Sequence, residues 1–416
     1  MKVSVIGGGS TYTPELVSGL AREAGRLPID ELVLMDPSEE RRDVVGGVAG
    51  RILRREGFTG RLTVTDSLEH AVDGADAVLL QLRVGGQAAR LHDETLPARC
   101  GCVGQETTGA GGLGKAMRTI PAVLDIAEQV DRRGAPGAWL IDFTNPVGIV
   151  TRALRDAGHP SIGLCNVAIG LQRKTARLLD VAPERVLVDQ VGLNHLTWVR
   201  RVLLDGVDVL PDLLARFLDV YAEELELPAQ LIAEQRALPS YYLRYFYAED
   251  EVVAEQRETR PRAAVVADIE EELLRLYRDP SLDTKPAVLE QRGGAFYSEA
   301  ATQLLASLVT GEGDVQVVDV PNEGAVPGLA DDDVVEAPAR IDAAGAHLLP
   351  QPALAPDLLG LVQHVAAYER LAVRAATTRE AADVRRALLC HPLVGQWDKA
   401  ALLADLVPDH LEEPVS

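Results

Sequence analysis

Aromatic residues are scarce in this chain, because Phe, Trp and Tyr make up only 4% of its 416 residues although 47% are hydrophobic. A core built mainly from Leu, Val, Ile and Ala is typical of layered α/β proteins, whose strands are covered on both faces. A chain of this length can also bury more than one core. The composition therefore predicts an α/β protein with two lobes and disfavours a β-sandwich.

Positive charge is also in short supply, since 41 Lys and Arg residues face 63 Asp and Glu residues, giving a formal net charge of −22. A protein this acidic repels polyanions at long range, and its basic residues are scattered singly along the chain. The sequence has no apolar run of about 18 residues, which a membrane helix needs. We therefore expect neither a nucleic-acid partner nor a membrane partner.

Cysteine is rare as well, with four residues at positions 100, 102, 165 and 390. Four cysteines in a chain this long do not make a disulfide framework, so the reducing cytoplasm is the expected compartment. Residues 1–6 lead directly into a glycine turn, and we expect no secretory leader there. Any cysteine with a special role is then a candidate metal ligand or catalytic residue.

What the first half of the chain does contain is a regular alternation of short β-branched runs and amphipathic stretches. The β-branched runs lie at 3–6, 32–35, 62–65, 77–82, 139–143 and 162–165, and stretches such as 14–23 and 117–132 lie between them. This rhythm predicts a Rossmann-type, doubly wound parallel sheet, whose ligands bind beyond the carboxyl ends of the strands. The second half predicts helices over 211–280 and 356–406, with short strands at 315–320 and 334–337.

The first strand ends in the run Gly7–Tyr12, which precedes a helix beginning near Pro14. Backbone N–H groups and the positive end of that helix would face one anion, as the pyrophosphate of a dinucleotide requires. The residues predicted to bind it are Gly7, Gly9, Ser10 and Thr11. The spacing departs from G-x-G-x-x-G because Tyr12 stands where the third glycine would be, and glycine turns also occur for packing alone.

Asp36 ends the second strand and supports a nucleotide site, because a carboxylate there can accept hydrogen bonds from a ribose diol. A negative charge at this position disfavours a 2′-phosphate, so NAD is the expected cofactor and not NADP. An alternative role is to cap the helix that starts near Pro37 or Ser38.

Five further polar segments follow likely strands or lie in loops bounded by glycine. They are Arg83–Gly86 with Arg90, Gly104–Gly109, Phe143–Pro146, Gly163–Asn166 and Gly192–His195. In this order they resemble glycoside hydrolase family 4, the NAD- and metal-dependent glycosidases. The resemblance spans essentially the whole chain and includes Tyr241–Tyr247 and Arg292–Ser298.

The resemblance implies two domains, arranged as in lactate and malate dehydrogenases. Residues 1–195 would form the NAD-binding Rossmann domain, and 196–416 a tightly packed mixed α+β domain for substrate, metal and oligomerisation. A homodimer or homotetramer is implied.

In the resembling family a cysteine and a histidine, matching Cys165 and His195, hold a divalent ion that is usually manganese. One Cys and one His alone make an incomplete site, with positions open to substrate or water. A thiolate would ordinarily favour zinc, so manganese rests on the resemblance and not on ligand softness. The other interpretation is a buried thiol and a hydrogen-bonded histidine without metal.

The resemblance also implies a mechanism of oxidation, C2 deprotonation, elimination, water addition and re-reduction, which differs from displacement by two carboxylates. A tyrosine matching Tyr242 is the expected base. A phenol with a pKa of about 10 needs nearby positive charge to act near neutral pH, such as the metal or Arg244.

The substrate expected from the resemblance is a 6-phosphosugar. Its predicted ligands are Arg90, Asn145, Asn166 and Arg262, with Glu106 on a sugar hydroxyl. Arg83 and Asn145 are predicted to contact NAD.

Asn166 follows the metal cysteine, where enzymes for α-linked substrates tend to have Asp as a general acid. An amide cannot give a proton to a leaving group, so Asn166 favours 6-phospho-β-glucosides. The alternatives are a 6-phospho-α-glucosidase, an enzyme for unphosphorylated galactosides or glucuronides, a 2-hydroxy-acid dehydrogenase, and an NAD-sensing protein without catalysis.

Overall fold

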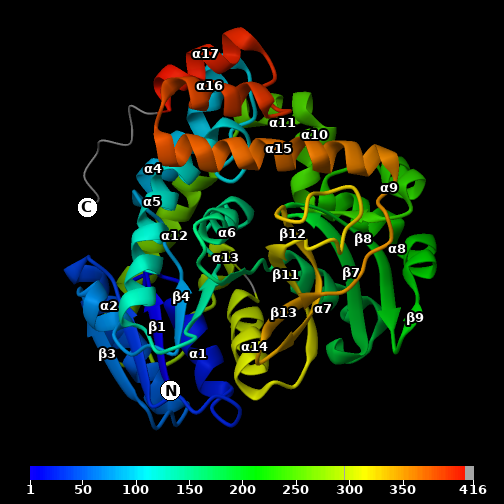
Figure 1. The fold of residues 1–416 in the computed structure, drawn as a ribbon. Helices are drawn as coiled ribbons and strands as arrows, with labels where there is room; N and C mark the ends of the chain where they lie inside the picture. The colour runs from blue at the N-terminus through cyan, green and yellow to red at the C-terminus, as the bar shows by residue number, and fades with distance from the viewer. Residues whose placement is uncertain (295, 408–416) are drawn as a thin grey trace.

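The computed structural model describes residues 1–294 and 296–407. Its centre is one 13-stranded sheet, in which eleven strands follow the order β10-β8-β7-β12-β11-β6-β5-β4-β1-β2-β3, while β13 pairs with β12 and β9 with β8 (Figure 1). The sheet therefore runs without a break through both halves of the chain.

The N-terminal part of the sheet is parallel and doubly wound. Its strands are β1 (Lys2–Ile6), β2 (Glu31–Met35), β3 (Arg61–Thr65), β4 (Ala77–Leu80), β5 (Trp139–Asp142) and β6 (Ser161–Gly163). The α-helices that alternate with them are α1 (Thr13–Arg22), α2 (Glu39–Arg55), α3 (Leu68–Val72), α4 (Gly86–Thr95), α5 (Gly109–Arg133), α6 (Val147–Asp156) and α7 (Val167–Leu179). Each pair of neighbouring strands from β3 to β6 is parallel, as the sequence rhythm predicts.

The strands end earlier than the hydrophobic runs suggest. β4 ends at Leu80, β5 at Asp142 and β6 at Gly163, although the runs continue to residues 82, 143 and 165. Pairing stops where parallel strands splay apart at the carboxyl edge, and the last apolar residues of each run then lie in the loop beyond it.

The C-terminal half adds antiparallel strands and more helices. The strands are β7 (Val186–Leu193), β8 (Leu196–Leu204), β9 (Val207–Asp208), β10 (Leu238–Pro239), β11 (Asp314–Pro321), β12 (Val334–Asp342) and β13 (Gly345–Leu348). The α-helices are α8 (Leu210–Leu225), α9 (Ala229–Gln235), α10 (Arg244–Tyr247), α11 (Glu249–Glu258), α12 (Arg262–Tyr277), α13 (Leu289–Arg292), α14 (Tyr297–Thr310), α15 (Pro356–Thr378), α16 (Ala381–Cys390) and α17 (Trp397–Leu406). Short 3-10 helices span Leu96–Cys100, Pro183–Arg185 and Tyr241–Leu243.

β11 and β12 are inserted between β6 and β7 in the sheet. β11 pairs with β6 at a single residue pair, and β12 pairs with β7 at another. Asp319 pairs with Gly163 of β6, and Glu336 pairs with Gly192 of β7. This junction joins the two halves of the chain, so the predicted boundary at residue 195 falls within one sheet and remains a prediction.

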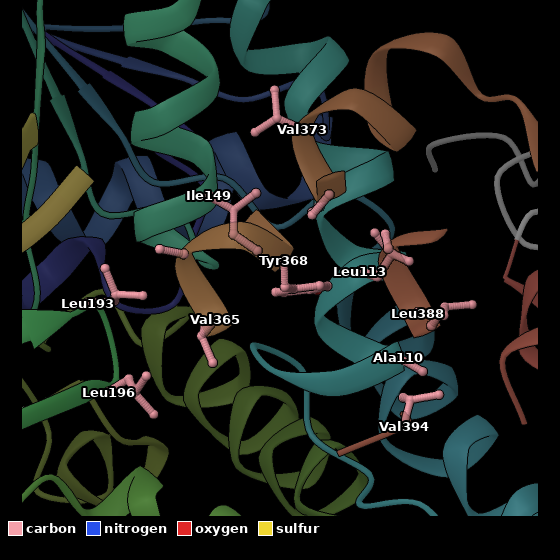
Figure 2. Packing of buried hydrophobic residues seen from close by; sticks show 14 of the residues in the cluster. Ala110, Leu113, Ile149, Leu193, Leu196, Val365, Tyr368, Val373, Leu388 and Val394 are labelled. Atoms are coloured by element: carbon pink, nitrogen blue, oxygen red, sulfur yellow. The ribbon is translucent and has the colours of Figure 1, made fainter. Parts of the chain in front are cut away.

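The long helix α15 packs on α5 and α6 and joins the C-terminal helices to the N-terminal half. Figure 2 shows side chains of the core cluster on and around this helix, with Ile149, Tyr368 and Leu113 from three different helices. Leu193 and Leu196, at the facing ends of β7 and β8, belong to the same cluster. The core therefore holds the turn between those two strands in place. Within the described ranges, no helix is long and apolar enough to span a bilayer.

Candidate active site

A cavity of about 930 Å³ opens at the carboxyl edge of the parallel strands. This volume lies near the upper end of the range for ligand pockets, about 300–1,000 Å³. The predicted site residues in its wall are Gly7, Ser10, Asp36, Arg83, Arg90, Glu106, Asn145, Asn166, Tyr242 and Arg262. The structure does not place Gly9, Thr11, Cys165 and His195 in the wall, but each interacts with a wall residue, which is Asp36 for Gly9, Glu270 for Thr11 and Tyr242 for Cys165 and His195.

The glycine turn is packed so closely that side chains are excluded from it. A Cβ atom on Gly7, whose φ is 88°, would lie 2.5 Å from the backbone oxygen of Gln81. One on Gly9 would lie 2.6 Å from the Asp36 carboxylate. Gly7 N and Gly8 N both donate to Met35 O, which ties the turn to the end of β2.

Asp36 links this turn to the start of α2. Its Oδ2 accepts a hydrogen bond from Gly9 N and its Oδ1 accepts one from Ser38 N, both at 3.0 Å. Ser38 is the residue that caps α2, because its hydroxyl accepts from Arg41 N. The Asp36 carboxylate thus borders the cavity. The alternative role that we considered for it, capping α2, is filled by Ser38.

A second layer behind the turn comes from the C-terminal half, and the sequence did not assign it a role. Arg292 Nε donates to Thr11 Oγ1 at 2.7 Å and forms an ion pair with Glu270 through Nη2 at 3.1 Å. Glu270 also accepts from Thr11 and pairs with Arg41. Arg292 belongs to a segment used for the resemblance, but Glu270 sits in an ordinary amphipathic helix, where no local signal marks it.

Two buried side-chain oxygens in the cavity wall lack hydrogen-bond partners among the described residues. They are Asn145 Oδ1 and Gln81 Oε1. A buried acceptor without a partner costs free energy, so these atoms are suited to a donor on a ligand.

Glu106 is surrounded by three cations. Arg83 pairs with it, Lys115 Nζ lies 2.5 Å from its Oε2, and Arg90 Nε lies 3.3 Å from its Oε1. Burial alone would raise the pKa of Glu106, but Arg83, Lys115 and Arg90 hold it well below its ordinary value. Burial and Arg83 lower the pKa of Lys115 to about 7. Lys115, which we did not predict from the sequence, directly follows the glycine-rich segment 109–114 of α5, and that segment does not indicate its charge partners.

His195 lies in the two-residue turn between β7 and β8 with a φ of 65° and is 7% exposed. Its Nδ1 is 3.0 Å from Thr107 Oγ1, which leaves Nε2 for another partner. Burial lowers the pKa of His195 to about 3, so the ring is neutral and keeps a lone pair at physiological pH. Its ring is stacked on Tyr242 with centroids 3.5 Å apart.

Cys165 follows β6 and is 4% exposed. Its sulfur is hydrogen-bonded by the Asn194 side chain, next to His195 in sequence, and it contacts the hydroxyl of Tyr297. Burial and the Glu336 carboxylate raise the pKa of this thiol. In the part of the chain that the structure describes, no cluster of three or more acidic, His or Cys side chains could hold a metal. Any cation here would depend on two protein ligands and on ligand atoms from outside.

Tyr242 lies between these groups and the cavity. Burial raises the pKa of its phenol well above the ordinary value, and Cys165 and Tyr245 add to the shift. Arg90 is the cation that opposes it. Arg244, which we considered as an activator, is instead bound to the hydroxyl of Tyr241 at 3.0 Å and to the carboxylates of residues 226 and 255.

Arg262 begins α12 and reaches the cavity wall. Its Nη2 donates to the backbone oxygen of Gln291 at 2.7 Å. Among residues 1–294 and 296–407, no carboxylate forms an ion pair with Arg262. Burial and repulsion from Arg90 lower its pKa, and the Glu94 carboxylate, which forms an ion pair with Arg90, partly opposes that shift. An anion between the two guanidinium groups would relieve that repulsion.

The chain matches two family models, "Family 4 glycosyl hydrolase" over residues 2–181 and "Family 4 glycosyl hydrolase C-terminal domain" over residues 190–394. It is 38% identical to a probable 6-phospho-β-glucosidase of Bacillus subtilis, over 95% of this chain and 92% of the relative. A phospho-α-glucosidase of Clostridium acetobutylicum is 28% identical over 97% of this chain and 96% of the relative.

Solved structures match over the full length as well. The 6-phospho-β-glucosidase of Thermotoga maritima, solved with manganese, NAD+ and glucose 6-phosphate, is 32% identical, with a TM-score of 0.92 and 100% of both chains covered. The malate dehydrogenase of Plasmodium falciparum has a TM-score of 0.55 at 16% identity and covers 91% of this chain and 99% of its own. This second likeness concerns the fold alone and confirms the predicted dehydrogenase-like Rossmann architecture.

Proposed function

The chain belongs to family 4 of the glycosyl hydrolases, as the resemblance implied, and we propose that it hydrolyses 6-phospho-β-glucosides with NAD and a divalent metal. One observation carries the proposal: a single cavity brings the glycine turn, the Glu106 cluster and Tyr242 together.

Manganese is the metal that we propose, because it is the ion in that relative's structure, and NAD is the cofactor.

The glycine turn and Asp36 fit a dinucleotide. The turn excludes side chains, as close approach to a pyrophosphate requires, and the Asp36 carboxylate stands where a ribose diol would bind. The unpartnered Asn145 Oδ1 offers a further acceptor in the same wall. A carboxylate at position 36 would repel a 2′-phosphate, so we assign NAD and not NADP.

Cys165 and His195 fit a divalent cation with open coordination positions. A neutral imidazole whose Nδ1 is engaged by Thr107 presents Nε2 as a ligand. Cys165 is buried and shares the neighbour Tyr242 with His195. When bound, NAD supplies a reversible hydride acceptor and the cation acidifies sugar hydroxyl groups.

Tyr242 is the residue that we assign to the proton at C2 of the sugar. It lines the cavity and is stacked on His195, so its phenol lies beside the region that the cation would occupy. Its raised pKa makes it a poor base by itself, and Arg90 is the cation of the described chain that favours its phenolate. Glu106, held ionised by its three cations, is placed to accept a hydrogen bond from a sugar hydroxyl.

Arg90, Arg262 and Asn145 are the residues that we assign to the 6-phosphate. Within the described ranges Arg262 forms no ion pair, and Glu94, the carboxylate that acts on it, is already paired with Arg90. A phosphate dianion between two guanidinium groups would accept charge-assisted hydrogen bonds from both.

A β-linked substrate is favoured by Asn166. This residue lines the cavity directly after Cys165, and an amide side chain cannot supply a proton to the departing group. The identity of 38% to a probable 6-phospho-β-glucosidase, against 28% to a phospho-α-glucosidase, favours the same assignment.

We also propose that the enzyme is a cytoplasmic homodimer or homotetramer. Its four cysteines are free, which suits a reducing compartment. Trp397 is 62% exposed and Leu402 44% exposed on α17, and Leu389 is 41% exposed on the neighbouring α16. Exposed apolar side chains on two helices in contact suit burial against another subunit. Light scattering of the purified protein would give the mass of the assembly.

The proposed activity is tested with nitrophenyl glycosides of both anomers, with and without a 6-phosphate, assayed with and without NAD and Mn²⁺. We expect the β-linked 6-phosphoglucoside to be hydrolysed much faster than the other three substrates, and only when both cofactors are present. Faster turnover of the α-linked 6-phosphoglucoside would favour the alternative specificity. Equal turnover without NAD would contradict the proposed chemistry.

A further inference from the structure

Glu336 is a buried carboxylate, 1% exposed, that none of the proposed steps uses. It lies on β12 opposite Gly192, at the single residue pair that joins β12 to β7. Its side chain accepts hydrogen bonds from Gln190 Nε2 and, at 2.8 Å, from Asn194 Nδ2. Two amide groups near the end of β7 therefore hold the carboxylate between them.

The Asn194 amide has a second partner, because it also donates a hydrogen bond to the Cys165 sulfur. An amide nitrogen carries two hydrogens, so one can point at Glu336 and the other at the sulfur. Rotation of the amide would break both hydrogen bonds in a buried environment. The Asn194 amide therefore connects Glu336 to Cys165.

Asn194 also fixes the neighbouring imidazole. It and His195 form the turn between β7 and β8, and His195 has a φ of 65°, which few residues other than glycine adopt. The flanking Leu193 and Leu196 are buried in the core, so the turn has little freedom to shift. The Asn194 amide, held by Glu336, thus orients the backbone that carries His195.

We propose that Glu336 is a positioning residue for the metal site, which acts through Asn194 to fix the Cys165 sulfur and the turn that carries His195. The inference rests on the proposed function, because it takes these two side chains as the protein ligands of the cation. With only two such ligands, the geometry of each matters more than in a site with four. Groups that orient metal ligands typically change metal affinity by about 10- to 100-fold when they are replaced.

The test is the affinity for Mn²⁺ in the NAD-loaded enzyme, followed through the electron paramagnetic resonance signal of the free ion. Glu336→Gln keeps the shape but offers one acceptor oxygen to two donors, so one amide is left unpaired. We expect Mn²⁺ to bind at least about 10-fold more weakly, with NAD affinity and melting temperature close to those of the wild type. In the Co²⁺-loaded variant the thiolate-to-cobalt absorption band should shift or weaken.

Asp189→Asn is the matched control. Asp189 lies on β7, is 3% exposed and pairs with Arg201 at 2.9 Å on the far side of the hairpin. It makes no hydrogen bond or ion pair with Asn194 in the described structure. This variant should bind Mn²⁺ as the wild type does, and a loss equal to that of Glu336→Gln would contradict a specific role for Glu336.

A double-mutant cycle separates action through Asn194 from an independent effect. Asn194→Ala should weaken Mn²⁺ binding as well, and the double variant should be no weaker than the worse single variant. Additive losses would overturn the proposal, as would an unchanged affinity in Glu336→Gln. If Glu336→Gln does not fold, Asn194→Ala with the cobalt spectrum carries the test. Cys165→Ser distinguishes failure of the positioning role from failure of the proposed metal site, because full Mn²⁺ binding in that variant would refute the metal site itself.

Discussion

Arg262 gives the sharpest test of how the substrate is selected. Replacing it with Ala removes a guanidinium group that lines the cavity, donates to Gln291 O and has no carboxylate partner within the described ranges. A hydrogen bond to a charged group contributes about 1.5–3 kcal/mol. Because about 1.4 kcal/mol corresponds to a factor of ten, the loss should lower kcat/KM for a 6-phospho-β-glucoside by about 10- to 150-fold.

The assay compares nitrophenyl β-glucoside 6-phosphate with its unphosphorylated analogue, for the wild type and the Arg262→Ala variant. For the phosphorylated substrate we expect kcat/KM to fall mainly because KM rises. The low kcat/KM of the unphosphorylated analogue should change little. Arg275→Ala is the control, since Arg275 lies on the same helix and is paired with Glu272 at the surface. Equal losses on both substrates would refute the assignment of Arg262 to the phosphate.

Three further perturbations probe the base, the nucleotide site and a buried acid. Tyr242→Phe should slow exchange of the C2 proton with deuterated water while NAD still binds, and unaltered exchange, followed by NMR, would assign the proton to another residue. Asp36→Ala should weaken NAD at least about 10-fold in a fluorescence titration and spare NADP, because a charged acceptor is lost; equal effects on both cofactors would contradict the ribose contact. Burial raises the pKa of Asp142 to about 8, above an unfolded value near 3.8. The folded state therefore holds more protons than the unfolded state between about pH 4 and 8, so Asp142 lowers stability as pH rises, by up to about 1.4 kcal/mol per pH unit. Asp142→Asn should remove that slope from urea unfolding curves, and an unchanged slope would show that this carboxyl group titrates normally.

The parallel half of the fold could be predicted from the sequence because its signals are local. Each strand is a short hydrophobic run, and most are followed by a polar or small residue. Parallel strands end at one edge, so Asp36, Asn145 and Asn166 were expected to meet there, and the cavity does bring them together.

Contacts that join distant parts of the chain could not be predicted in this way. Glu336 reaches Asn194 only because β12 is inserted between β11 and β7, and no periodicity specifies that pairing. Arg244 was considered beside Tyr242 from their closeness in sequence. It contacts Tyr241 instead, since residues three positions apart in a helical turn share a face, whereas residues two positions apart do not. Lys115 and Glu270 look like ordinary helix residues until their partners are known.

The most direct test of the proposed chemistry is the fate of the C2 hydrogen during hydrolysis in D2O. Nitrophenyl β-glucoside 6-phosphate is turned over with NAD and Mn²⁺, and the glucose 6-phosphate released is examined by NMR. Removal of the C2 proton by Tyr242 predicts deuterium at C2 of the product. Product that keeps protium at C2 in every molecule would contradict an elimination and point to direct displacement at C1.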